Sequence, residues 1–132
     1  MRSFALPIIA TLLAAAPAAA ADRPKGEERL AKALEGRVAG KPVNCINLRQ
    51  IRSSQIIDRT AIIYDAGNVL YVNRPRNGAE SLDNWDTLVT KTSTSQLCSV
   101  DVVQTYDTSS RINTGFVFLG DFVPYRRASP RN

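Results

Sequence analysis

The sequence predicts a mainly β protein: an antiparallel sheet curled into a small sandwich or barrel, with one short N-terminal helix. Three observations support this fold class. β-Branched and aromatic residues form several short runs after Pro42, turn-forming residues separate these runs, and helical spacing occurs only near the start of the chain. Five or six short strands within about 80 residues are typical of a sandwich or a small barrel.

Residues 1–21 have the pattern of a secretory signal peptide. A positive charge at Arg2 precedes an apolar run over residues 4–16, and the alanines at 18–21 supply the small side chains that signal peptidase requires. The apolar run is shorter than the roughly 20 residues of a membrane-spanning helix. We therefore expect this segment to be removed, and the remaining chain to be periplasmic or secreted and to have no membrane span.

Residues 22–42 are the predicted N-terminal helical segment. Apolar side chains recur along it at helical spacing, at Leu30, Ala33, Leu34 and Val38. Acidic residues occupy its first turn, and Gly36 or Gly40 can end the helix. We expect its charged face to be solvated.

Residues 43–125 are the predicted β-rich domain. Strand-like runs lie at residues 56–57, 61–64, 69–72, 87–92, 99–106 and 115–118. A Gly-Asn pair between the second and third runs predicts a hairpin. Residues 73–86 lack periodicity and form a long loop, and Pro124 is expected to end strand pairing at a sheet edge. Residues 126–132 are a polar tail.

Cys45 and Cys98 are the only cysteines of the chain. An oxidising compartment outside the cytoplasm favours a disulfide between them. Closing a loop of this length stabilises a fold by about 4 kcal/mol in the chain-entropy model. The chain has no histidine that could activate a free thiol. We therefore predict a structural bridge between the two cysteines.

The composition disfavours several function classes. The absence of histidine removes the commonest metal ligand and the usual general base, so we expect no metal, no cofactor and no catalytic triad. A net charge of +5 is too small to predict nucleic-acid binding by an exported protein. Aspartates such as Asp83 and Asp86 leave open a carboxylate-dependent hydrolase that acts on a cell-wall or polysaccharide substrate.

Six residues are the candidate ligand-binding residues: Arg49, Arg52, Arg74, Arg76, Tyr71 and Trp85. The planar guanidinium of arginine suits bidentate binding of carboxylate or phosphate. We therefore expect a non-enzymatic binding module whose ligand is an anionic envelope component or another exported protein. The alternative for these arginines is pairing with Asp58, Glu80 or Asp83. A further alternative for the whole protein is an inhibitor of secreted enzymes that uses residues 73–85.

Three short motifs resemble a known family. They are Cys45-Ile46-Asn47-Leu48-Arg49-Gln50-Ile51, Leu97-Cys98-Ser99 and Leu119-Gly120-Asp121-Phe122-Val123-Pro124-Tyr125. Over most of residues 44–125 the chain resembles small exported bacterial proteins that are classed as a domain of unknown function. Members of that family often have a second cysteine pair, where this chain has residues 78–80 and 116–118. The resemblance therefore implies a less restrained long loop in this chain.

Overall fold

The computed structural model describes residues 19–129, so residues 1–18 of the predicted signal peptide lie outside the described residues. The elements are α1 (Ala19–Ala33), β1 (Arg37–Ala39), β2 (Cys45–Asn47), η1 (Leu48–Gln50), β3 (Ser53–Ile57), β4 (Ala61–Asp65), β5 (Val69–Asn73), η2 (Ala79–Ser81), β6 (Thr87–Val89), β7 (Gln96–Cys98), β8 (Val102–Asp107), β9 (Ile112–Phe118) and β10 (Phe122–Arg127). The elements η1 and η2 are short 3-10 helices. In this part of the chain no helix is both long enough and apolar enough to cross a membrane.

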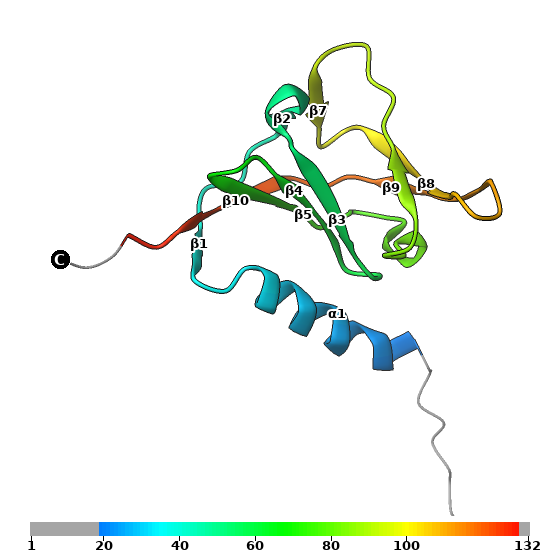
Figure 1. The fold of residues 1–132 in the computed structure, drawn as a ribbon, viewed down its shortest axis with the longest axis horizontal. Helices are drawn as coiled ribbons and strands as arrows, with labels where there is room; N and C mark the ends of the chain where they lie inside the picture. The colour runs from blue at the N-terminus through cyan, green and yellow to red at the C-terminus, as the bar shows by residue number, and fades with distance from the viewer. Residues whose placement is uncertain (1–18, 130–132) are drawn as a thin grey trace, which may run out of the picture.

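Within residues 19–129 the strands form three sheets. The strand order is β1-β10-β5-β4-β3 in the five-stranded sheet, β6-β8-β9 in the three-stranded sheet and β2-β7 in the two-stranded sheet. All strand pairs are antiparallel. Figure 1 shows α1 along one side of the β-structure and β2 and β7 on the opposite side. The mainly β fold class predicted from the sequence is confirmed, and it takes the form of a small sandwich.

Two hydrophobic cores lie on opposite faces of the five-stranded sheet. Along β4, Ile62 and Tyr64 belong to the main core between the two larger sheets, whereas Ala61 and Ile63 belong to a second core beneath α1. This alternation follows from the two-residue period of a strand. Leu30 of α1 is 2% exposed and packs into the second core, and burial of a leucine stabilises a fold by about 2 kcal/mol. The five-stranded sheet is therefore the middle layer of the molecule.

The predicted helical segment, residues 22–42, contains a helix and a strand. The helix α1 ends at Ala33, and Gly36 then adopts a φ of 75°, which turns the chain out of the helix. The next residues form β1, which pairs with β10, and Val38 in this strand is 60% exposed. The prediction that Val38 belongs to the apolar face of the helix is wrong, because pairing with a strand from the far end of the chain overrides the local pattern.

The strand β10 is longer than the sequence predicts. It runs through Pro124 to Arg127 between β1 and β5, so Pro124 does not end the pairing and the polar tail does not begin at residue 126. The oxygen of Pro124 accepts a hydrogen bond from Gly40 N at 2.7 Å. Proline is tolerated at this position because β1 ends at Ala39, so the residue opposite Pro124 lies beyond the end of that strand. The pairing there lacks only the hydrogen bond that a proline nitrogen cannot donate.

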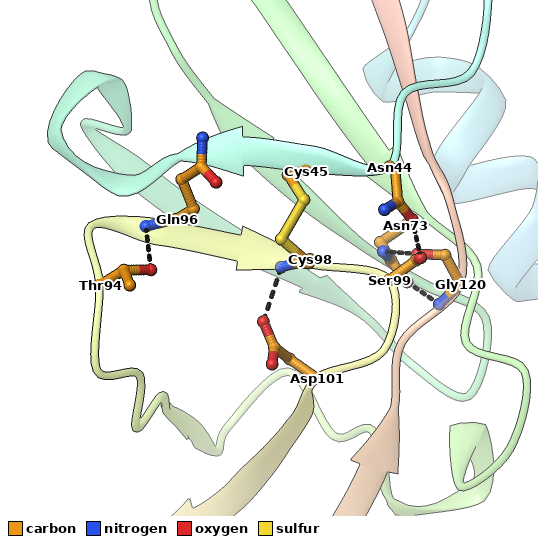
Figure 2. Close-up of a disulfide and its surroundings, with 9 residues drawn as sticks. All are labelled: Asn44, Cys45, Asn73, Thr94, Gln96, Cys98, Ser99, Asp101 and Gly120. Carbon is orange, nitrogen blue, oxygen red and sulfur yellow. Dashed lines mark hydrogen bonds between the residues drawn. A yellow bond between two sulfur atoms is a disulfide. The ribbon is translucent and has the colours of Figure 1, made fainter.

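Cys45 and Cys98 form a disulfide, as predicted from the sequence. They lie directly opposite each other in the β2–β7 pair, and Figure 2 shows the bond between the two strands. Asp101 Oδ2 accepts a hydrogen bond from Cys98 N at 2.7 Å, and Asn44 O accepts one from Ser99 N at 2.8 Å. These bonds hold two short strands that the sequence analysis does not predict.

The long loop over residues 73–86 is fastened to β9. Arg76 N donates a hydrogen bond to Phe118 O at 2.9 Å, and Phe118 N donates one to Asn77 O at 2.9 Å. Leu82, near the end of the loop, is 2% exposed and belongs to the main core. The loop is therefore part of the packed structure.

Residues 78–80 and residues 116–118 lie against each other. Gly78 precedes η2 and packs so closely on β9 that a β-carbon at this position would collide with the carbonyl oxygen of Phe116. Hydrogen bonds and close packing thus restrain the loop. Trp85, two residues before β6, is the strongly exposed large side chain of this loop, at 85%.

Candidate functional site

A groove separates the free edges of two sheets. It has a volume of about 840 Å³ and lies between β3 of the five-stranded sheet and β6 of the three-stranded sheet. Within residues 19–129, each of these strands pairs with another strand on one side only. Side chains from α1 and from the loop before β6 complete the lining: Arg29, Lys32, Ala33, Asn84 and Asp86. Its size is within the range of ligand sites in proteins.

Trp85 lines a second cavity, of about 310 Å³, at one end of the groove. The two cavities share Arg29 and Asn84. The indole is 85% exposed, but the backbone around it is fixed. Asp83 Oδ1 accepts a hydrogen bond from Trp85 N at 2.9 Å, and Asp58 Oδ1 accepts one from Asn84 N at 2.6 Å. An exposed indole on a fixed turn can act as an aromatic anchor in an interface.

Asp58 connects the walls at this end of the groove. Besides the bond from Asn84 N, it accepts one from Arg29 Nη1 to its Oδ2 at 2.8 Å. Both partners of this ion pair are more than one third exposed, at 59% and 37%, so it stabilises the fold by no more than about 1 kcal/mol. Its role is geometric, because it links α1, the β3–β4 turn and the loop before β6.

A third cavity, of about 210 Å³, shares Ser54 and Leu88 with the groove and lies at its other end. Arg52 and Tyr64 also line this cavity. The Tyr64 hydroxyl is buried and, within residues 25–129, has no hydrogen-bond partner. Burial raises the pKa of Tyr64, so its hydroxyl stays protonated at neutral pH.

Arg74 and Arg76, two of the predicted ligand-binding residues, make bonds within the protein. Arg74 forms a bidentate ion pair with Glu27 of α1, with distances of 2.5 and 3.0 Å. This hydrogen bonding lowers the pKa of the Glu27 carboxyl below its ordinary value. Arg76 donates to Leu119 O at 2.7 Å and to Ser99 O at 3.1 Å. Both guanidinium groups therefore tie the long loop to the rest of the fold.

The other predicted site residues do not gather on one face. Arg52 precedes β3 at the end of the sheet where β4 finishes, whereas Arg74 follows β5 at the end where β4 begins. Arg49 is exposed on η1, and Tyr71 is half-buried against the main core. Of the six, Arg52 and Trp85 line the cavities of the groove, at its two ends. The structure thus does not bring the two groups of arginines together.

The carboxylates considered for catalysis accept hydrogen bonds from nearby groups. Asp86 accepts one from the Thr114 hydroxyl, and Asp83 accepts one from Trp85 N. Glycoside hydrolysis needs two carboxyl groups about 5–10 Å apart across a bound sugar, and one must keep its proton. Among the described residues, no three acidic or cysteine side chains are grouped as metal ligands. The carboxylate-dependent hydrolase stays a prediction, which incubation with cell-wall polysaccharide would test.

Two cations of the groove wall, Arg29 and Lys32, were not among the predicted site residues. The sequence assigns them to a solvated helix face, but the structure places them beside the free edge of β3. Residues three apart lie on the same side of a helix, so their spacing does predict a shared face. What the sequence lacks is the position of that face over a sheet edge.

Comparisons of the chain with protein-family models, with curated proteins and with solved structures gave no match.

Proposed function

We propose that this protein is an exported, non-enzymatic binding module that holds an extended acidic segment of another exported protein in the groove between β3 and β6. The observation that supports it best is the free edge of β3 along the groove. An extended peptide can add to such an edge as a further strand, with backbone hydrogen bonds that supply affinity and side-chain contacts that supply specificity.

The composition of β3 favours strand addition. Its sequence, Ser53–Ile57, contains no charged residue and no proline. Edge strands of soluble proteins are usually protected by charges, prolines, bulges or a covering element. An unprotected edge beside a groove therefore suits an incoming strand.

Besides Asp86, whose carboxylate accepts a hydrogen bond from Thr114, the groove wall carries two cations, Arg29 and Lys32, that favour an acidic ligand. Lys32 is exposed and, within residues 25–129, forms no ion pair with a carboxylate. Arg29 is held in place by Asp58 and stays 59% exposed. Charge complementarity of this kind selects acidic partners and speeds their association. Trp85 supplies an aromatic contact at the end of the same groove.

The compartment is part of the proposal. The signal-like start of the sequence and the Cys45–Cys98 disulfide both suit the periplasm or the extracellular space, where disulfides persist. The partner would then be another exported protein.

Fluorescence of Trp85, the only tryptophan of the chain, can test the proposal. A short peptide of alternating valine and glutamate should shift the emission, and the matched valine-lysine peptide should not. The K32Q variant should weaken binding about two- to fivefold, since it removes one partly exposed charge. The K91Q variant, at an exposed position outside the groove lining, is the matched control. Equal binding of the two peptides would contradict the acidic specificity.

Proline variants of β3 test strand addition itself. Neighbouring residues of a strand direct their N–H groups to opposite edges, so one of Ser54 and Gln55 donates towards the groove. Proline at that position removes a donor available to the ligand and preserves the β3–β4 ladder, whereas proline at the other position breaks the ladder. The variant that keeps its stability should lose peptide binding. If it binds as well as the wild type, the peptide does not add as a strand.

A further inference from the structure

Cations gather at the edge of the five-stranded sheet that lies opposite to β3. Arg37 of β1 pairs in register with Arg127 of β10, and Val38 pairs with Arg126. The guanidinium of Arg126 lies beside Gly40, next to Lys41 in the chain. We call Arg37, Lys41, Arg126 and Arg127 the basic edge. Figure 1 shows β1 and the end of β10 at the side of the molecule that leads to the C-terminus.

The charges of the basic edge are not balanced within the described structure. Like charges directly opposite each other on neighbouring strands repel. Within residues 25–129, none of the four cations forms an ion pair with a carboxylate. Two acidic residues are the obvious candidates to neutralise these cations, and in the described structure neither forms an ion pair with them. Glu35 is the nearest acidic residue along the chain to β1, and Asp65 accepts a hydrogen bond from Gly67 N through its Oδ1. Arg37 Nη1 donates a hydrogen bond to Tyr125 O at 3.4 Å, which leaves its charge unneutralised, so a bound anion would meet four cations without a carboxylate partner among these residues.

The arrangement of these cations fits a surface better than a small ligand. Tyr125 packs on the α1 side of β10, so Arg127 and its partner Arg37 point to that side and Arg126 points to the other. The side chains thus flank the sheet edge on both sides and do not converge on one point. The outermost strand also exposes an apolar side chain between them, Val38, at 60%. An extended anionic plane can contact all of these groups at once.

From these contacts we infer that the basic edge docks the protein on a membrane surface rich in anionic phospholipid. Clusters of four or more Lys and Arg side chains bind such surfaces through the headgroup phosphates, and guanidinium groups suit phosphate geometry. This site is independent of the groove, because β1 and β3 are the two opposite edges of the five-stranded sheet. A protein held by β1 would leave β3 free for a partner.

Vesicle flotation tests the inference. The protein is mixed with vesicles of phosphatidylglycerol and phosphatidylethanolamine, or of phosphatidylcholine alone, at low and high salt. Wild-type protein should float with the anionic vesicles at low salt and be released at high salt. The double variant R126Q/R127Q should bind them about tenfold or more weakly, since each cation near an anionic surface contributes to the attraction. The matched control R49Q/K91Q removes two other exposed cations and should bind almost as well as the wild type.

Three results would overturn the inference. The first is flotation with phosphatidylcholine vesicles as strong as with the anionic vesicles. The second is an equal loss of vesicle binding in both double variants. The third is absence of flotation together with tight binding of a soluble polyanion such as dextran sulfate. Thermal unfolding checks that R126Q/R127Q is folded. Its midpoint should be unchanged or higher, because the substitution removes repulsion between strands.

Discussion

The side-chain amide of Asn73 bonds both backbone groups of Gly120. Asn73 Nδ2 donates to Gly120 O at 2.7 Å, and Asn73 Oδ1 accepts from Gly120 N at 3.0 Å (Figure 2). Asn73 is fully buried at the end of β5, and Gly120 is buried between β9 and β10. A β-carbon at Gly120 would collide with the carbonyl oxygen of Arg74. The glycine of the Leu-Gly-Asp-Phe motif is therefore needed for this close approach.

Replacement of Asn73 by alanine should lower the free energy of unfolding by about 3 kcal/mol, because two buried backbone groups lose their partner. Urea denaturation followed by circular dichroism measures the change. N68A, at an exposed asparagine in the β4–β5 turn, is the control and should differ from the wild type by less than about 0.5 kcal/mol. A similar small change for N73A would mean that other groups or water satisfy Gly120.

Loss of the disulfide should destabilise the protein by about 4 kcal/mol, because Cys45 and Cys98 close a loop with a sequence separation of 53. Urea midpoints with and without dithiothreitol measure this effect. The double variant C45S/C98S should match the reduced wild type and should not respond to the reductant. Identical midpoints for oxidised and reduced wild-type protein would show that the bridge does not restrain the unfolded chain.

The Y64F variant should be as stable as the wild type or more stable by about 1 kcal/mol. The hydroxyl of Tyr64 is buried without a partner in residues 25–129, whereas its ring packs edge-on against Phe122 with centroids 5.9 Å apart. Phenylalanine keeps the ring contact and removes a polar group that burial penalises. Y71F is the matched control at a half-buried tyrosine. A loss of more than about 1 kcal/mol for Y64F would show that the hydroxyl has a partner, such as water.

The ion pair between Arg74 and Glu27 should stabilise the fold at neutral pH and not in acid. Hydrogen bonding to Arg74 lowers the pKa of Glu27 below its ordinary value of 4.5, so this stability is present above that value and is lost as the pH falls through the lowered pKa. R74Q should raise the pKa of Glu27 in an NMR titration. Because both partners are about half exposed, we expect a loss of only about 0.5 kcal/mol at pH 7 and none at pH 2. An equal loss at both pH values would assign the effect of R74Q to packing.

The parts of the fold with a strong local pattern were predictable from the sequence. The apolar runs at residues 61–64 and 69–72, rich in β-branched and aromatic residues, together with the Gly-Asn turn predicted the β4–β5 hairpin, and the count of cysteines predicted the disulfide. The three-residue strands β1, β2 and β7 were missed, because none of them contains a run of β-branched and aromatic residues. These strands exist through their partners, which lie far away in the sequence.

The candidate site was harder to predict than the fold. The sequence identifies Arg74 and Arg76 as possible anion ligands but cannot show their partners, Glu27 and Leu119 O, which lie 47 and 43 residues away. It likewise shows that Arg29 and Lys32 share a helix face, and leaves open which sheet edge that face adjoins. Contacts between residues far apart in the sequence decide which cations bond other groups of the protein and which can bind a ligand.

The helix α1, which lines one wall of the groove, packs on the second core and not on the main core. Of the described side chains of α1, Leu30 is buried and Ala33 is partly buried against the sheet, and neither belongs to the main core. The helix can therefore open at a lower free energy than the sandwich, and its backbone amides should exchange with deuterium sooner than those of β4. A ligand in the groove would contact Arg29 and Lys32 and so stabilise the packed position of α1. When a ligand occupies the groove, the amides of α1 should therefore exchange more slowly than in the free protein. The amides of β8, which lies on the other face of the five-stranded sheet, should exchange at the same rate in both states.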